Sequence, residues 1–117
     1  AGSMSGALDL RPFADKWNLK SILGDINKKP SVWFLNSFYG KVFKLNKNDH
    51  PALIFDCGES DFFFDCNISI HNLLVDKQIQ HEFSFRKGGH NWEYWLESLP
   101  LHLDFFEKVF SDNTKQN

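Results

Sequence analysis

Residues 52–85 have the sequence ALIFDCGESDFFFDCNISIHNLLVDKQIQHEFSF, which predicts two buried strands joined by a helix. The first strand is a continuous apolar run over 52–55 that follows Pro51 and ends near Cys57-Gly58. Such runs are typical of parallel strands that are covered on both faces. The second strand, over 79–85, alternates apolar with polar residues and stops at Lys87-Gly88-Gly89.

The segment between these strands has helical spacing. Residues 67–77 carry Ile70, Leu73 and Leu74, and Asp65 or Asn67 can cap the first turn. A connection of this length joins parallel strands with right-handed connectivity, so the whole stretch is one βαβ unit. The predicted fold class is therefore α/β, a mostly parallel sheet flanked by helices.

Further helices are predicted on either side of this unit. Residues 92–110 are helical, with Ser98 capping a new turn and Pro100 near its start. Residues 13–23 and 32–45 form two more helices, while residues 1–7 have the character of a strand end entering a loop. The last helix packs on the sheet through an apolar stripe made of Leu101, Leu103, Phe105, Phe106, Val109 and Phe110.

Two clear strands and a third uncertain one are too few for a stable parallel sheet, which needs both faces and both edges covered. The aromatic content also indicates an incomplete sheet, since 19 of 117 residues are Phe, Trp or Tyr. So many large rings need more covering than a domain of this size supplies. We therefore expect missing strands that precede Ala1.

Composition excludes several classes of function. The net charge is 13 − 15 = −2, so no polyanion-binding surface is indicated and nucleic acid is not an expected partner. No stretch approaches the roughly 18 consecutive apolar residues of a membrane span, so no membrane partner is expected. Residues 1–10 lack the pattern of a secretory signal, which favours the cytoplasm slightly and leaves export of a longer precursor open.

Cysteine and histidine spacing predicts no metal site. Cys57 and Cys66 are nine residues apart without a C-x-x-C pair, so they are expected to be buried free thiols. The five histidines show no ligand motif. Four of them are expected to be surface residues or structural hydrogen-bonding partners: His50, His71, His81 and His102.

Two loops at the carboxyl ends of the predicted strands carry the side chains best suited to acid–base catalysis. Residues 56–61 form an acidic loop that ends in Asp61, and residues 88–92 form a Gly-Gly-His loop that contains His90. Open α/β sheets place their sites at this edge. Adjacent parallel strands would bring the Asp61 carboxylate to one imidazole nitrogen of His90 and leave the other free to accept a proton. That pair is the base half of a nucleophilic hydrolase.

A nucleophile must then lie upstream, because triads of α/β-hydrolases run Ser, acid, His along the chain. No G-x-S-x-G motif occurs in the sequence. Ser3 and Ser5 imitate it only superficially, since neither has glycine at both −2 and +2. Residues 2–6 are equally explained as a tight loop of small residues or, in part, a cloning remnant.

The sequence resembles the C-terminal part of the putative esterase family, which includes tributyrin esterase, S-formylglutathione hydrolase and the family-one carbohydrate esterases. Residues 88–95, GGHNWEYW, with Ser98-Leu99-Pro100 and Phe105-Phe106, resemble the histidine region of that family. Residues 54–62, IFDCGESDF, resemble its acid loop, and residues 3–9 resemble the segment after its sixth strand. The resemblance implies the C-terminal portion of an α/β-hydrolase fold.

The resemblance also implies roles for individual residues. Asp61 corresponds to the catalytic acid and His90 to the general base, whereas Asp56 looks structural. The nucleophilic serine and the oxyanion-hole donors would precede Ala1. Leu96 departs from the family, whose members often carry a polar or basic residue there.

Each of these roles has a structural alternative. Asp61 could cap the turn before a helix, and His90 could be a structural hydrogen-bonding residue. Trp92, Tyr94 and Trp95 could line an acyl or sugar pocket, with Trp92 the candidate for substrate binding. Packing of the last helix on the sheet explains the same three rings.

The sequence therefore predicts the C-terminal part of a serine carboxylesterase, with residues 1–110 in the hydrolase domain and 111–117 as a polar tail. The expected partners are a small ester or acylated sugar, the missing N-terminal part of the same protein, and a second copy in a homo-oligomer. No cofactor is expected, and the chain alone should be inactive. The alternative is a non-catalytic α/β module that self-associates through an aromatic-rich sheet face.

Overall fold

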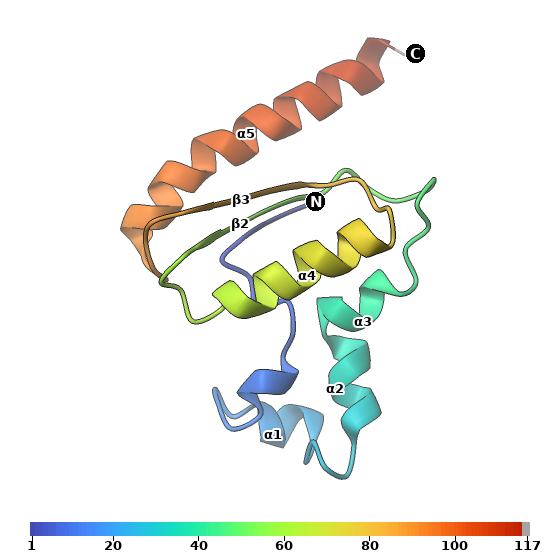
Figure 1. The fold of residues 1–117 in the computed structure, drawn as a ribbon, viewed down its shortest axis with the longest axis vertical. Helices are drawn as coiled ribbons and strands as arrows, with labels where there is room; N and C mark the ends of the chain where they lie inside the picture. The colour runs from blue at the N-terminus through green and yellow to red at the C-terminus, as the bar shows by residue number, and fades with distance from the viewer. Residues whose placement is uncertain (116–117) are drawn as a thin grey trace.

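A three-stranded parallel sheet lies at the centre of the computed structural model, which describes residues 1–115 (Figure 1). The strands are β1 (Gly2–Met4), β2 (Ile54–Gly58) and β3 (Glu82–Arg86), in the order β1-β2-β3. The two clearly predicted strands and the uncertain third are all present, although β2 begins two residues later than the predicted run over 52–55 and continues to Gly58. The strand predicted over 79–85 begins later, at Glu82, because Ile79 donates its backbone N–H to Leu74 O and still belongs to the turn after the helix.

Two long helices cover the sheet: α4 (Phe64–Asp76) on one face and α5 (Trp92–Lys115) on the other (Figure 1). The predicted βαβ unit is confirmed, since α4 connects the parallel neighbours β2 and β3. Helix α4 begins three residues before the predicted start. Neither predicted cap is used, since the N-cap is Phe63 and makes no side-chain hydrogen bond.

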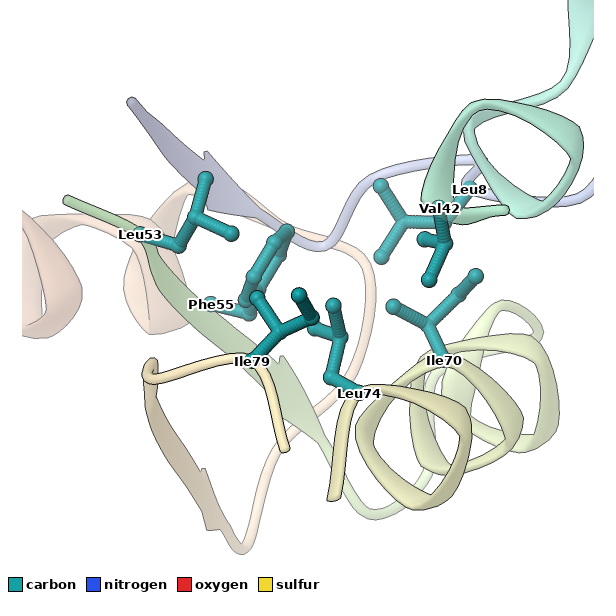
Figure 2. Packing of buried hydrophobic residues seen from close by; sticks show 7 residues of the cluster. All are labelled: Leu8, Val42, Leu53, Phe55, Ile70, Leu74 and Ile79. Atoms are coloured by element: carbon teal, nitrogen blue, oxygen red, sulfur yellow. The ribbon is translucent and has the colours of Figure 1, made fainter. Parts of the chain in front are cut away.

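Alternate residues of β2 face the two helical layers, which explains its continuous burial. Leu53 and Phe55 belong to the main core cluster, which also contains Ile70 and Leu74 of α4 (Figure 2). Asp56 points to the opposite face, where it pairs with a histidine of α5. The cluster of buried residues on the α4 face consists of Leu8, Val42, Leu53, Phe55, Ile70, Leu74 and Ile79.

The connection from β1 to β2 contains more and shorter helices than the sequence predicts. The expected helix over 13–23 is instead a short 3-10 turn, η1 (Arg11–Phe13), followed by α1 (Leu19–Leu23). Trp17 and Asn18 separate the two, because both adopt positive φ angles, of 48° and 56°, that no helix accommodates.

The helix expected over 32–45 is likewise two helices, α2 (Pro30–Asn36) and α3 (Phe38–Val42). Ser37 has extended backbone between them. Its hydroxyl donates to Trp33 O and accepts the N–H of Leu10, so the kink satisfies a backbone group of the distant β1 loop.

Helix α5 is a single helix, contrary to the new turn expected at Ser98. Pro100 lies inside it, and Ser98 is fully buried and donates its hydroxyl to Tyr94 O of the preceding turn. The predicted packing stripe is only partly correct. Phe105 is buried, but Leu101, Leu103 and Phe110 are exposed. The segment expected to begin a polar tail is helical through Lys115, and residues 116–117 lie outside the described part of the chain.

A buried polar network attaches α5 to the sheet. Asp56 is 1% exposed, and its Oδ2 accepts from both terminal nitrogens of Arg86 at 3.3 Å. Arg86 also donates to Ser98 Oγ at 2.6 Å, and His102 Nε2 lies 3.6 Å from Asp56 Oδ1. Burial raises the pKa of Asp56, but the partners His102, Ser98 and Arg86 outweigh it and hold this pKa below its ordinary value of 3.8.

Within residues 1–115, no helix combines the length and the apolar character that crossing a membrane requires. Cys57 and Cys66 are buried free thiols, as the sequence predicts.

Truncation of Leu74 to alanine should test the core on the α4 face. Leu74 is fully buried, so Leu74→Ala should lower the free energy of unfolding by about 2–5 kcal/mol through lost burial and an unfilled cavity. Val75→Ala is the matched control, because Val75 is 54% exposed and its truncation should change stability by less than about 0.5 kcal/mol. Urea unfolding measures both, and equal effects would contradict the packing described.

Replacement of Asp56 by asparagine should change the acid sensitivity of the fold. A carboxyl whose pKa is lowered by folding stabilises the native state above its unfolded pKa, and this contribution is lost as pH falls through the folded value. Asp56→Asn should therefore cost about 2 kcal/mol or more at pH 7 and lose less further stability below pH 4 than the unsubstituted chain. Urea unfolding between pH 7 and pH 3 measures this, and parallel curves would contradict it.

Candidate functional site

The loops that follow β2 and β3 are tied together by backbone hydrogen bonds. Glu59 donates its N–H to Arg86 O, and Ser60 donates to Gly88 O, both at 2.9 Å. The approach at Gly58 leaves no room for a side chain, because a Cβ there would lie 2.3 Å from Gly88 O. Residue 58 must therefore be glycine for the two loops to meet.

Asp61 and His90 are in direct contact at this edge, as the sequence predicts. The Nδ1 atom of His90 lies 3.0 Å from Asp61 Oδ2. The Asp61 side chain is fully buried, whereas that of His90 is 29% exposed. A carboxylate only accepts, so Nδ1 carries the proton and Nε2 is the nitrogen with the free lone pair.

The Asp61 carboxylate is held rigidly by its own loop. Its second oxygen, Oδ1, accepts the backbone N–H of Phe63 at 2.8 Å, and its backbone N–H donates to Gly58 O at 3.0 Å. Asp61 thus caps the turn before α4 and binds His90 at the same time. The sequence suggests either a turn cap or a partner of His90 for Asp61. Both contacts are present, with Oδ1 capping the turn and Oδ2 binding His90.

Aromatic rings surround the His90 imidazole. The ring centroid of Phe62 lies 4.5 Å from that of His90, and those of Trp95 and Phe63 lie at 4.8 Å and 5.3 Å. Trp95 and Phe63 meet the imidazole edge to face, a preferred arrangement of such rings. These contacts limit rotation of the imidazole, so it is oriented by packing as well as by Asp61.

The three aromatic residues considered as pocket lining have different environments. Tyr94 is buried, lies under the Arg86 guanidinium at 4.5 Å, and has a pKa raised to about 12, mainly by burial. Trp95 packs against His90. Trp92 is 74% exposed and contacts Trp95 at 5.3 Å, so it is free to meet a ligand, and its substrate-binding role stays a prediction.

Two exposed aromatic rings of the site are not predicted from the sequence as site residues. Phe62 and Trp17 are each 55% exposed, and their centroids are 6.0 Å apart. Phe62 follows the acid directly, and this adjacency could have indicated it. No sequence signal identifies Trp17, since its position depends on a left-handed backbone and a fold over the distant Phe63.

Neither serine of residues 2–6 is joined to His90 by a hydrogen bond in the described part of the chain. Ser5 is 3% exposed, directly follows β1, and has its hydroxyl close to the Cys57 thiol. Cys57 is no better a nucleophile, because burial raises its pKa to about 12 and keeps it protonated.

Residues 1–115 contain no group of three or more His, Cys, Asp or Glu side chains arranged to hold a metal ion. A broad cavity of about 940 Å³ lies at the opposite end of the sheet, against Leu53, Ile79 and Phe105. It does not include Asp61 or His90, so it is separate from this site.

Comparison with known proteins identifies the fold. An acetyl esterase from Caldicellulosiruptor saccharolyticus is 26% identical over 91 residues, which are 77% of this chain. A solved ferulic acid esterase superposes with a TM-score of 0.66 at 26% identity over 93% of the chain. The S-formylglutathione hydrolase of Staphylococcus aureus superposes with a TM-score of 0.73 at 23% identity over 90%. No protein-family model matches the sequence.

The chain has part of an α/β-hydrolase fold. It corresponds to the C-terminal portion of that fold, and the resemblance to the putative esterase family is confirmed by the acetyl esterase and the ferulic acid esterase. This chain spans 34% of the acetyl esterase, 41% of the ferulic acid esterase and 43% of the S-formylglutathione hydrolase.

In this α/β-hydrolase portion, the contact at Gly58 should be essential for the site. Gly58→Ala forces a Cβ against the Gly88 carbonyl and should lower the free energy of unfolding by about 1–3 kcal/mol. Gly89→Ala is the control, since a Cβ there meets nothing closer than 3.7 Å and should cost less than about 1 kcal/mol. Urea unfolding compares the variants, and equal stability would contradict the close approach.

Proposed function

We propose that this chain supplies the acid and the base of a serine carboxylesterase. The observation that carries the proposal is the 3.0 Å contact between buried Asp61 and half-buried His90 at the carboxyl ends of adjacent parallel strands. The names of the relatives, an acetyl esterase and a ferulic acid esterase, support ester hydrolysis as the reaction class.

The proposed mechanism uses the two nitrogens of His90 separately. Nε2 takes the proton of a serine hydroxyl as that oxygen attacks the ester carbonyl, and it then gives the proton to the leaving alcohol. Asp61 holds Nδ1–H and stabilises the imidazolium between these steps. The same base then activates the water that releases the acid from the acyl-enzyme. No cofactor takes part.

We propose that the serine and the oxyanion-hole donors belong to a part of the hydrolase outside this chain, which is thus a C-terminal fragment that depends on the N-terminal part of the same protein. The coverage of 34–43% of the relatives supports this. The buried position of Ser5 against Cys57 supports it as well. The 117 residues alone should then have no triad-dependent turnover.

The proposed substrate is a small ester or an acylated sugar. Acetyl and feruloyl esters are suggested by the names of two relatives, and S-formylglutathione by a third. Trp92 is the proposed contact for the substrate. Its exposed ring packs against Trp95, which in turn packs against His90, so Trp92 lies near the catalytic pair. Phe62 and Trp17 offer further exposed ring faces there.

A second candidate function is a non-catalytic module that associates with itself. It is favoured by the outer edge of β1, which pairs only with β2 among the described residues, and by the exposed Leu103 and Phe110 of α5. A concentration-dependent dimer in light scattering would favour homo-oligomer formation. A monomer that unfolds cooperatively would count against self-association.

Replacement of His90 tests the proposed reaction. In a polypeptide that joins this chain to a nucleophile-bearing hydrolase part, His90→Ala should lower kcat/KM for 4-nitrophenyl acetate by about 10⁴-fold or more, because triad members act as a unit. His50→Ala is the control, since His50 is bonded to Pro51 O outside the site, and it should leave kcat/KM unchanged.

The unextended chain provides the complementary measurement. A serine-directed fluorophosphonate probe should leave it unlabelled. Stoichiometric labelling at Ser3 or Ser5 would refute the external nucleophile, whereas near-normal activity of the His90→Ala variant would remove His90 from the mechanism.

A further inference from the structure

A pair of histidines joins α4 to the start of β3, at the end of the sheet opposite Asp61 and His90. His71 lies in the C-terminal half of α4, and His81 immediately precedes β3. The two side chains are separated by ten residues in sequence but meet with His71 Nδ1 and His81 Nε2 only 2.8 Å apart. Both residues are half-buried, so solvent ions can reach them.

The hydrogen bonds of this pair determine where its protons lie. His81 Nδ1 is 2.9 Å from Ile79 O, and a carbonyl only accepts, so Nδ1 carries the proton. His81 Nε2 therefore presents a lone pair, and His71 Nδ1 donates to it. A backbone carbonyl that accepts one ring N–H is one of the partners that commonly orient metal-ligating histidines.

Packing also orients the second ring. The His71 imidazole stacks on Phe83 with a centroid distance of 4.6 Å and an interplanar angle of 19°. One ring is thus held by a backbone carbonyl and the other by an aromatic face. The two imidazoles come from separate elements and face each other across their hydrogen bond without help from a ligand.

We propose that His71 and His81 form a two-nitrogen binding site for a divalent transition-metal ion of the Zn²⁺, Ni²⁺ and Cu²⁺ type, for which imidazole is a suitable ligand. Two metal–nitrogen bonds form, to His71 Nδ1 and His81 Nε2, while water fills the remaining positions. The proton on His71 Nδ1 moves through solvent to Nε2 of the same ring, so a neutral pair binds the ion without net proton release.

The spacing suits such a chelate. Metal–nitrogen bonds of about 2.0–2.1 Å place two ligand nitrogens roughly 3 Å apart at a right angle and slightly further apart in a tetrahedral site. The observed 2.8 Å is close to the shorter of these separations, and both rings must turn out of their mutual hydrogen bond so that the two lone pairs face the ion. An ion here would link α4 to β3 and stabilise the folded chain by mass action.

Zn²⁺ titration of the full 117-residue chain, followed by calorimetry and by thermal unfolding, tests the proposal. We expect saturable binding and a Zn²⁺-dependent rise in Tm, and His71→Gln and His81→Gln should each weaken the affinity by about tenfold or more. His50→Gln is the matched control and should retain both effects. Circular dichroism establishes that each variant is folded.

A second measurement on the unsubstituted chain does not depend on any variant. Substoichiometric Cu²⁺ should broaden the imidazole NMR signals of His71 and His81 before those of His50 and His90. Equal affinity of His71→Gln and His50→Gln for Zn²⁺, or broadening confined to other histidines or the amino terminus, would overturn the site. Neither result bears on Asp61 and His90, so the proposed esterase role is tested separately.

Discussion

The parallel pairing of β2 with β3 is the constraint on which the rest of the molecule depends. Residue Phe55 is paired with Phe83 in this register, so both strands end at the same edge and their loops leave side by side. Gly58 lets the loops touch, and backbone bonds to Arg86 O and Gly88 O hold them there. The Asp61–His90 contact follows from these backbone interactions, because each side chain belongs to one of the two loops.

The same two strands carry a second, structural acid. Asp56 is five residues before Asp61, yet it faces α5, where it is buried, accepts hydrogen bonds from Arg86 and lies beside His102. Asp61 faces the loop edge and has one oxygen free for a partly exposed histidine. The direction of the side chain is set by strand alternation for Asp56 and by the loop for Asp61, and it separates the acid that anchors a helix from the acid that binds His90.

The high aromatic content is used in two ways. Some rings form the surroundings of His90, where Phe62, Phe63 and Trp95 restrict the imidazole. Others, such as Phe110 on α5, which stacks on Phe106, are largely exposed. The chain spans less than half of these α/β-hydrolase relatives, and its aromatic residues are thus divided between the surroundings of His90 and an exposed surface.

Much of the fold could be predicted from local patterns. The apolar run over 52–55 and the Ile70–Leu74 spacing are dictated by burial on a sheet and a helix, and the order acid, then histidine, follows directly from the chain. Helix ends and kinks could not be predicted, because they depend on distant partners: Ser37 turns the chain where Leu10 needs an acceptor, and Ser98 stays inside α5 where Arg86 reaches it. Trp17 beside Phe62 and His71 against His81 were likewise decided by tertiary structure alone. Short-range propensity is encoded in neighbouring residues, whereas a contact between loops exists only once the strands between them are paired.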